Sequence, residues 1–343
     1  MKSNIASLFR SFSVTAVGLV LVLAGCGGGS NISPNAGIGP TQPGFITLFP
    51  NVLPARGPLL NITRGPDGNL WFTDARAQIG RITPSGVVTF FSNGINTNAI
   101  TIGITAGPDG NLWFTEAGTD RIGRITPSGV VTEFAAGISA QAGLNSIAAG
   151  PDGNIWFTEL FGNRIGRITP NGVVTEFSTG ISPNAGIQGI TAGPDGNLWF
   201  TEINGNRIGR ITPTGVVTEF ANGITMNAAP FGITTGPDGN LWFTEADNAA
   251  IGRITPSGIV TEFRTGMLPY SSPGFIAAGP DGNLWFTETE ADKIGRMSPT
   301  GTLTEFSYTL PDNARPLGMT PGPDGNMWFT LQDAATIGKI TVQ

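Results

Sequence analysis

Gly107-Pro108-Asp109-Gly110-Asn111-Leu112-Trp113-Phe114-Thr115 is one of seven near-identical segments in this chain of 343 residues. The spacing between copies is 42 residues once and 43 residues five times, and the copies begin at Gly65, Gly107, Gly150, Gly193, Gly236, Gly279 and Gly322. Each copy contains one of the seven tryptophans of the chain. A period of about 40–45 residues made of short strands is typical of a β-propeller with one four-stranded blade per repeat. The sequence therefore predicts an all-β fold, a seven-bladed propeller with antiparallel blades.

The second repeat shows the four strands expected in each blade. We expect the inner strand at residues 103–106, the second at 112–116, the third at 121–126 and the outer strand at 130–134. Between the first two strands, Asp109-Gly110 supplies the positive φ angles that tight hairpins require. Apolar residues occupy both faces of the outer three strands, as expected when each blade is packed between two others. We expect the Trp-Phe pairs to fill those contacts.

The last repeat ends before an outer strand could form. One period before the first repeat, residues 44–49 read Gly-Phe-Ile-Thr-Leu-Phe, which matches the outer-strand segment Gly-Val-Val-Thr-Glu-Phe at residues 129–134. We therefore expect the N-terminal strand to complete the C-terminal blade and close the ring. Closure would remove the exposed sheet edges that promote aggregation. The propeller is expected to occupy residues 44–343.

The first 25 residues have the pattern of an export signal. Lys2 and Arg10 precede an apolar run over residues 14–23, and Leu-Ala-Gly-Cys ends at Cys26. This ending resembles the bacterial lipobox, so we expect a lipoprotein signal peptide at 1–25, lipid on Cys26 and a flexible linker at 26–43. The alternative is an ordinary signal peptide with an incidental cysteine. The chain is expected to be exported and anchored in the cell envelope, in the outer membrane if one is present, because Gly27 rather than Asp follows the cysteine.

Composition excludes several classes of function. The chain has one cysteine and no histidine, so it can form neither an intramolecular disulfide, a Ser/His/Asp triad nor a Cys/His metal cluster. Without Lys2 and Arg10 it has 16 basic and 24 acidic residues, a net charge of −8, and no basic cluster that would bind nucleic acid. We expect a monomer that contacts the membrane through its lipid.

A carboxylate recurs at the end of the second strand in six of the seven blades. These residues are Asp74, Glu116, Glu159, Glu202, Glu245 and Glu288, and the last blade has Leu331 at the same position. Such a ring could bind a cation through oxygen ligands. The alternative, which we favour, is pairing with an equally regular series of cations, Arg81, Arg124, Arg167, Arg210, Arg253, Arg296 and Lys339.

Departures from the repeat are concentrated in the late blades, on the face formed by the loops between blades and between the second and third strands. The candidate ligand-binding residues there are Phe231, Tyr270, Phe275, Glu288, Arg315 and Gln332. Aromatic rings, an arginine and an amide around one mouth would suit a moderately apolar ligand. Ordinary loop packing is the alternative explanation.

The repeat Gly-Pro-Asp-Gly-Asn-Leu-Trp-Phe-Thr-Glu, followed by Asn-Arg-Ile-Gly-Arg-Ile-Thr within residues 193–212, resembles the virginiamycin B lyase (streptogramin lyase) family over all seven blades. The resemblance implies an enzyme that linearises cyclic depsipeptide antibiotics by elimination across an ester C–O bond. It also implies a histidine base, a second histidine and carboxylates that hold Mg²⁺. At the matching positions this chain has Gly274 and Leu317 for the histidines, and Arg315 and Gln332 for carboxylates.

Loss of a positioned base costs about 10²–10⁴ in rate, and an arginine at a ligand position repels a metal ion. We therefore expect a non-catalytic propeller that binds a small molecule, glycan or protein at its loop face. We expect no cofactor, and Mg²⁺ only if lyase activity is retained. The alternative is a C–O lyase of the virginiamycin B lyase type, or a lactonase, with carboxylate-based chemistry in which Glu288 or Glu290 serves as the base.

Overall fold

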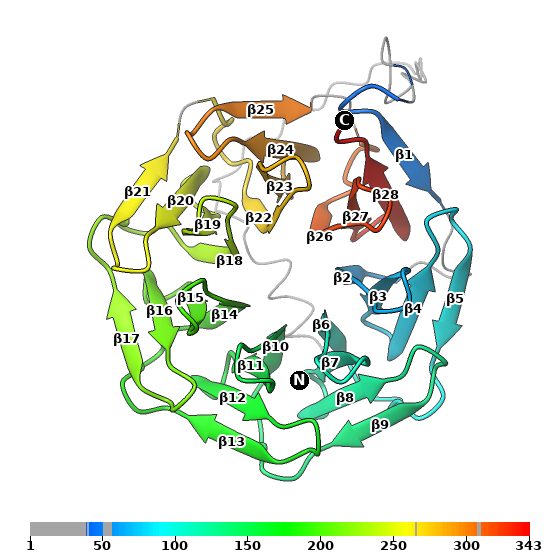
Figure 1. The fold of residues 1–343 in the computed structure, drawn as a ribbon, viewed down its shortest axis with the longest axis vertical. Coiled ribbons are helices and arrows are strands. Elements are labelled where there is room, and N and C mark those ends of the chain that lie inside the picture. The colour runs from blue at the N-terminus through cyan, green and yellow to red at the C-terminus, as the bar shows by residue number, and fades with distance from the viewer. Residues whose placement is uncertain (1–38, 40, 51–56, 265, 307–309) are drawn as a thin grey trace, which may run out of the picture.

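Seven four-stranded sheets surround a central axis in the computed structural model of the chain (Figure 1). The structure describes residues 39, 41–50, 57–264, 266–306 and 310–343. The predicted signal peptide and most of the predicted linker therefore lie outside the described residues. In the part of the chain that is described, no helix has the length and apolar character needed to cross a membrane.

Six blades run outward from the axis in chain order, the seventh takes β1 as its outer strand, and neighbouring strands in every blade are antiparallel. The innermost strands are β2 (Leu59–Arg64), β6 (Thr101–Ala106), β10 (Leu144–Ala149), β14 (Ile187–Ala192), β18 (Pro230–Thr235), β22 (Pro273–Ala278) and β26 (Pro316–Pro321). The second strands are β3 (Leu70–Asp74), β7 (Leu112–Glu116), β11 (Ile155–Glu159), β15 (Leu198–Glu202), β19 (Leu241–Glu245), β23 (Leu284–Glu288) and β27 (Met327–Leu331). The third strands are β4 (Gln78–Ile82), β8 (Arg121–Ile125), β12 (Arg164–Ile168), β16 (Arg207–Ile211), β20 (Ala250–Ile254), β24 (Lys293–Met297) and β28 (Thr336–Ile340). The outer strands are β5 (Val88–Phe91), β9 (Val131–Phe134), β13 (Val174–Phe177), β17 (Val217–Phe220), β21 (Val260–Phe263), β25 (Leu303–Phe306) and β1 (Ile46–Phe49). The strands predicted for the second repeat are confirmed to within two residues.

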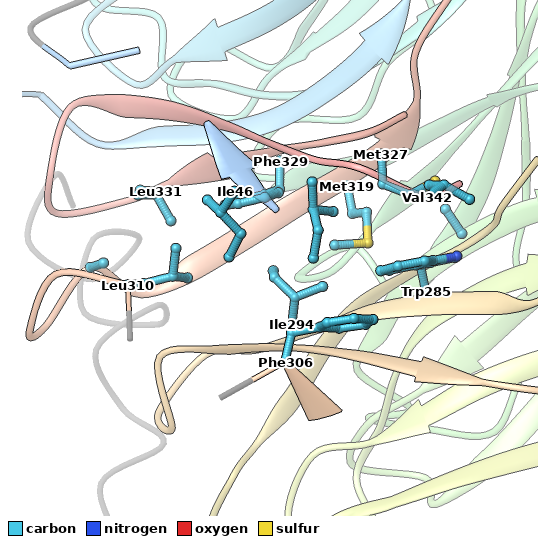
Figure 2. Close-up of a cluster of buried hydrophobic side chains, with 13 residues drawn as sticks. Ile46, Trp285, Ile294, Phe306, Leu310, Met319, Met327, Phe329, Leu331 and Val342 are labelled. Carbon is cyan, nitrogen blue, oxygen red and sulfur yellow. The ribbon is translucent and has the colours of Figure 1, made fainter. Parts of the chain in front are cut away.

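The ring is closed by β1, which pairs antiparallel with β28 in the sheet ordered β1-β28-β27-β26. Ile46 lies opposite Ile340, and Phe49 stacks on Trp328 with ring centroids 5.2 Å apart. Figure 2 shows the contact between the last two blades, where Ile46 from β1 joins residues of both blades in one buried cluster. The predicted closure by the N-terminal strand is thus confirmed.

The tryptophans fill the contacts between neighbouring blades, as predicted. All seven are fully buried, and Trp113 packs against Ile147, Ile155 and Phe157 of the following blade. Its ring also stacks on Phe134 of its own outer strand, with centroids 5.4 Å apart. The same packing recurs around the ring, so the core consists of seven similar clusters between sheets rather than one central core.

The hairpin between the two inner strands differs slightly from the expectation. Gly110 has φ +75°, but Asp109 does not have a positive φ. Instead, the Asp109 carboxylate accepts hydrogen bonds from the backbone N–H of Asn111 and from Trp113 Nε1, the latter at 3.0 Å. A turn that ends in one left-handed glycine is a common three-residue hairpin. The main role of the Asp109 carboxylate is therefore to hold the indole of Trp113 in position.

Candidate functional site

A bulge in each innermost strand determines which side chains line the propeller mouth. In the fifth blade the pairing of the two inner strands shifts register between Pro230 and Ile233, and a threonine of the second strand bonds to backbone groups at the bulge. Thr244 Oγ1 accepts from the N–H of Gly232 in its own blade at 2.9 Å and donates to the carbonyl of Gly274 in the next blade at 2.7 Å. The final link, from Thr330 to the carbonyl of Leu60, spans the closure at 2.8 Å. This belt of hydroxyls fixes the register of neighbouring blades.

The second residue of each innermost strand forms a ring around the loop-face end of the central channel. The seven members are Leu60, Ile102, Asn145, Gln188, Phe231, Gly274 and Leu317. Five are apolar, and the remaining two, Asn145 and Gln188, are buried and share a side-chain hydrogen bond. The channel beneath them has a volume of about 130 Å³ and is also lined by Phe231 and Phe275, whose rings meet edge to face. The channel is therefore polar on one side and aromatic on the other.

Gly274 leaves a gap in this ring between Phe231 and Leu317. The gap is an open hollow of about 30 Å³, with Arg315, Gln332 and other loop residues at its edge. A Cβ at position 274 would lie 2.9 Å from Thr289 Oγ1, so a larger residue would fill the hollow and displace its wall. The hollow can admit one small group of a ligand, while the rest would lie across the mouth.

Arg315 is held over the hollow by an acidic environment. Its guanidinium lies 2.6 Å from Glu290 Oε1 and 4.0 Å from Asp333 Oδ2. Its backbone N–H donates to Asp292 Oδ1 at 2.8 Å, and its φ of +50° is in the left-handed region. Its carbonyl accepts from the N–H of Gln332 at 3.1 Å. The arginine is thus a positioned cation whose charge is balanced by neighbouring carboxylates.

The structure brings only some of the predicted site residues together. Phe231, Gly274, Arg315, Leu317 and Gln332 line the hollow, and Phe275 lies one position deeper in the channel. Tyr270 does not line either space and is 78% exposed on the preceding loop. Glu288 is fully buried at the end of β23 and lines neither space.

The favoured pairing of the strand-end carboxylates with the regular cations is wrong. Arg124 lies 3.8 Å from Asp109 in the hairpin at the other end of the blade, its guanidinium lies 5.5 Å from the Trp113 ring centroid, and it donates to the carbonyl of Pro170 in the next blade. Most other members of the series make the same contacts. The cation stands opposite the tryptophan in the sheet register, on the hairpin side of the strand.

Each strand-end glutamate instead lies beside a second glutamate from the outer strand of its own blade. These pairs are Glu116–Glu133, Glu159–Glu176, Glu202–Glu219, Glu245–Glu262 and Glu288–Glu305. Burial, followed by the charge or hydrogen bond of the outer glutamate, raises the pKa of the strand-end member to about 8 in the first four pairs and to about 7 for Glu288. Burial therefore favours the protonated form of these carboxyl groups, and it is opposed by nearby cations such as Arg164, 3.6 Å from Glu159, and Arg207, 4.0 Å from Glu202.

The carboxylates do not form a metal ring. Among the residues that the structure describes, no group of three or more His, Cys, Asp or Glu side chains could hold a metal ion. Around the hollow, the only carboxylate in the lining is Glu290, and it is paired with Arg315. The donor set at this site therefore does not fit Mg²⁺. The ion needs several oxygen ligands, and the guanidinium of Arg315 would repel it.

Three features of the site were missed by the sequence interpretation. The outer glutamates, the Asn145–Gln188 bond and the threonine belt all join residues from different strands or blades. One signal was available in the sequence, because every blade with Glu at the end of the second strand also has Glu in the outer strand. The two blades without the first Glu also lack the second, and have Asp74 with Phe90 and Leu331 with Leu48 at these positions.

The virginiamycin B lyase family model matches residues 38–224 and 139–343. A streptogramin B lyase structure is 37% identical, with a TM-score of 0.81, over 87% of this chain and 98% of that one. The catalytically inactive histidine-to-alanine variant of virginiamycin B lyase from Staphylococcus aureus with quinupristin is also 37% identical, with a TM-score of 0.80, over 87% of this chain and 100% of that one.

More distant structures share the fold alone. The WD40 propeller domain of Doa1 is 12% identical with a TM-score of 0.69 over 87% of this chain and 98% of that one. No curated protein matches the chain. Because the family model covers the propeller and the solved lyases align over nearly their full lengths, the chain belongs to the virginiamycin B lyase family.

Proposed function

We propose that the protein is a lipid-anchored envelope propeller that binds a small, moderately apolar ligand at its loop face without cleaving it. The observation that carries this proposal is the hollow at Gly274, which lies between the apolar side chains of Phe231 and Leu317 and below Arg315 and Gln332. Apolar walls with a few polar groups at the edge are typical of ligand sites. A hollow of about 30 Å³ admits only part of a ligand, so binding depends on the wider mouth.

The residues at the mouth do not supply the groups that the family's elimination chemistry needs. The chain has no histidine, and the positions that correspond to the family's two histidines are Gly274 and Leu317. Arg315 stands at the position where the family resemblance implies a metal-binding carboxylate. The carboxylate of Glu290, close by, is already paired with Arg315. The general base and the metal ligands of the family mechanism therefore have no counterparts here.

Quinupristin is the first probe, because one of the similar structures contains it. Purified protein should bind it, measured by calorimetry, and should leave the ring intact after prolonged incubation, measured by mass spectrometry. Phe231→Ala should weaken binding at least about tenfold through loss of an aromatic wall. Val130→Ser, on the opposite face, is the matched control. Magnesium-dependent linearisation that is abolished by changes at the mouth would show that the protein is a lyase.

A second candidate, altered carboxylate-based lyase or lactonase chemistry, is favoured by one observation. Glu290 lines the hollow and its side chain is 42% exposed, so it can reach a ligand. If Glu290 is a base, slow turnover of a cyclic ester should be lost in Glu290→Gln while ligand affinity is retained. Equal turnover by Glu290→Gln and the unaltered protein would remove this candidate.

Lipid anchoring is tested separately. Cys26→Ser should release the protein from the membrane fraction of cells that process lipoproteins, whereas the unaltered chain should sediment with membranes. The same distribution for both proteins would argue for an ordinary signal peptide.

A further inference from the structure

Five large apolar side chains occupy the same exposed position around the ring. Each follows the glycine of the hairpin between the third and outer strands and is 61–66% exposed. They are Val87, Val130, Val173, Val216 and Ile259, here called the valine rim. Side chains alternate along a strand, so Val131 packs against the preceding blade while its neighbour Val130 faces solvent. The valine rim is therefore a periodic surface that the blade-to-blade packing does not use.

The valine rim lies on the face opposite the mouth. Arg124 connects the two kinds of hairpin there, because it lies 3.8 Å from Asp109 in its own inner hairpin and donates to Pro170 in the outer hairpin of the next blade. The mouth residues stand at the other ends of the same strands. A surface that contacts the valine rim therefore leaves the hollow accessible.

The chain enters the propeller at this same face. Thr341 N–H donates to the carbonyl of Phe45, which repeats the bond from Thr126 to Val130 in the second blade. Gly44, whose N–H donates to Thr341, is therefore at the level of the valine rim. The 18 residue-to-residue steps from Cys26 to Gly44 can span at most roughly 60 Å, even fully extended. A lipid at Cys26 would therefore tether the propeller from the face that carries the valine rim.

The distribution of charge also distinguishes the two faces, because the acidic excess lies on the loop-face half. The hairpin half has seven aspartates of the repeat, matched by the seven regular cations, with Arg64 in addition. The other half has 17 acidic residues and, within the described chain, seven basic ones. It stays acidic when the four strand-end glutamates with a pKa of about 8 are left out, because 13 acidic residues remain. Anionic lipid headgroups would repel the loop face and tolerate the hairpin face.

We propose that the valine rim is the membrane-contacting surface of the anchored protein, so that the ligand mouth faces away from the bilayer. The proposal rests on the lipid anchoring in the proposed function. Its chemistry is shallow insertion of branched apolar side chains between headgroups, with a near-neutral hairpin face behind them. The occupant is a lipid bilayer that contains phosphatidylethanolamine and anionic phosphatidylglycerol.

The test uses residues 26–343 coupled through Cys26, the only cysteine, to a maleimide lipid in such vesicles. A fluorescent amino acid replaces Val216 in one variant and Met226 in another; Met226 is 80% exposed in a loop on the mouth face. Brominated lipid should quench the probe at position 216 at least about threefold more than the probe at 226. Equal quenching, stronger quenching at 226, or none at either position would overturn the proposal.

A second variant separates lipid contact from other uses of the valine rim. The combined variant Val130→Ser, Val173→Ser and Val216→Ser should reduce quenching of a probe placed at position 87, whereas Met226→Ser should not. Matched melting temperatures would show that both variants fold. Concentration-dependent dimers in solution that the serine variant abolishes would overturn the proposal in favour of self-association. Quinupristin binding by the same vesicles reports on the mouth independently, so its failure counts against the binding function alone.

Discussion

Glu202→Gln is predicted to stabilise the protein at neutral and alkaline pH. Glu202 is fully buried, lies 4.0 Å from Arg207 and neighbours Glu219, which accepts hydrogen bonds from the backbone N–H and the hydroxyl of Ser182. Burial, and then the charge of Glu219, raises the pKa of Glu202 to about 8. The unfolded chain releases this proton near pH 4.3. Folding must therefore keep a proton on Glu202 that the unfolded chain has lost.

The sign and size of the effect follow from that difference. A raised folded-state pKa gives stability that is fully present below the unfolded value and is lost as pH rises through about 8. Each pH unit between the two values is worth about 1.4 kcal/mol, so one group could cost up to about 4 kcal/mol at pH 7. Five such groups cannot all cost this much, because whole domains are stable by only about 5–15 kcal/mol. We therefore expect about 1–2 kcal/mol for the single variant.

Urea unfolding of the unaltered protein and of Glu202→Gln, at pH 4 and pH 8 and equal ionic strength, measures this difference. The variant should be more stable at pH 8 and about equal at pH 4. Glu219→Gln is the control, because it weakens the acceptor for Ser182 and should destabilise the protein at both pH values. If Glu202→Gln is less stable than the unaltered protein at pH 8, Glu202 is ionised and paired with Arg207, and the reasoning fails.

Three further changes probe the ring. Thr330→Val removes the hydroxyl that donates to Leu60 across the closure, and should lower the free energy of unfolding in urea by about 1–3 kcal/mol, whereas the same change at an exposed threonine should have little effect. Phe49→Ala removes the ring stacked on Trp328 and should cost about 2–4 kcal/mol, seen as a lower melting temperature with unchanged quinupristin affinity. Burial raises the pKa of Asp195, but hydrogen bonds from the neighbouring asparagine and tryptophan outweigh this and hold it below its usual value. Its contribution to stability is thus present above the unfolded pKa and lost as pH falls through the folded one, so Asp195→Asn should flatten the loss of stability below about pH 4; an unchanged acid transition would refute this.

The fold was predictable because its determinants are local and repeated seven times. The turn glycine, the tryptophan and the apolar residues of each blade are within one period, and the match of residues 44–49 to the outer strands gave the closure as well. The partners of the charged residues were not predictable from equal spacing. Arg124 and Glu116 both recur once per blade, but they lie at opposite ends of adjacent strands, and only the register separates them.

The candidate site was predicted in part for a related reason. Irregular residues at the starts of innermost strands, such as Phe231 and Leu317, meet at the mouth because every blade points the same strand end at the axis. Glu288 also stands at a strand end near this face, but the second strand lies farther out, and the side chain is buried beside Glu305, Lys293 and Ser271. Tyr270 is in a loop whose path no periodic pattern specifies.

Closure by β1 has a consequence for biogenesis. Ile46 leaves the ribosome roughly 290 residues before its partner Ile340, a delay of about 15–60 seconds at ordinary rates of synthesis. Throughout that interval a short apolar segment waits with its backbone unpaired and its phenylalanine without the indole that will cover it. Nascent chains should therefore depend on a chaperone for protection until the final blade has been made.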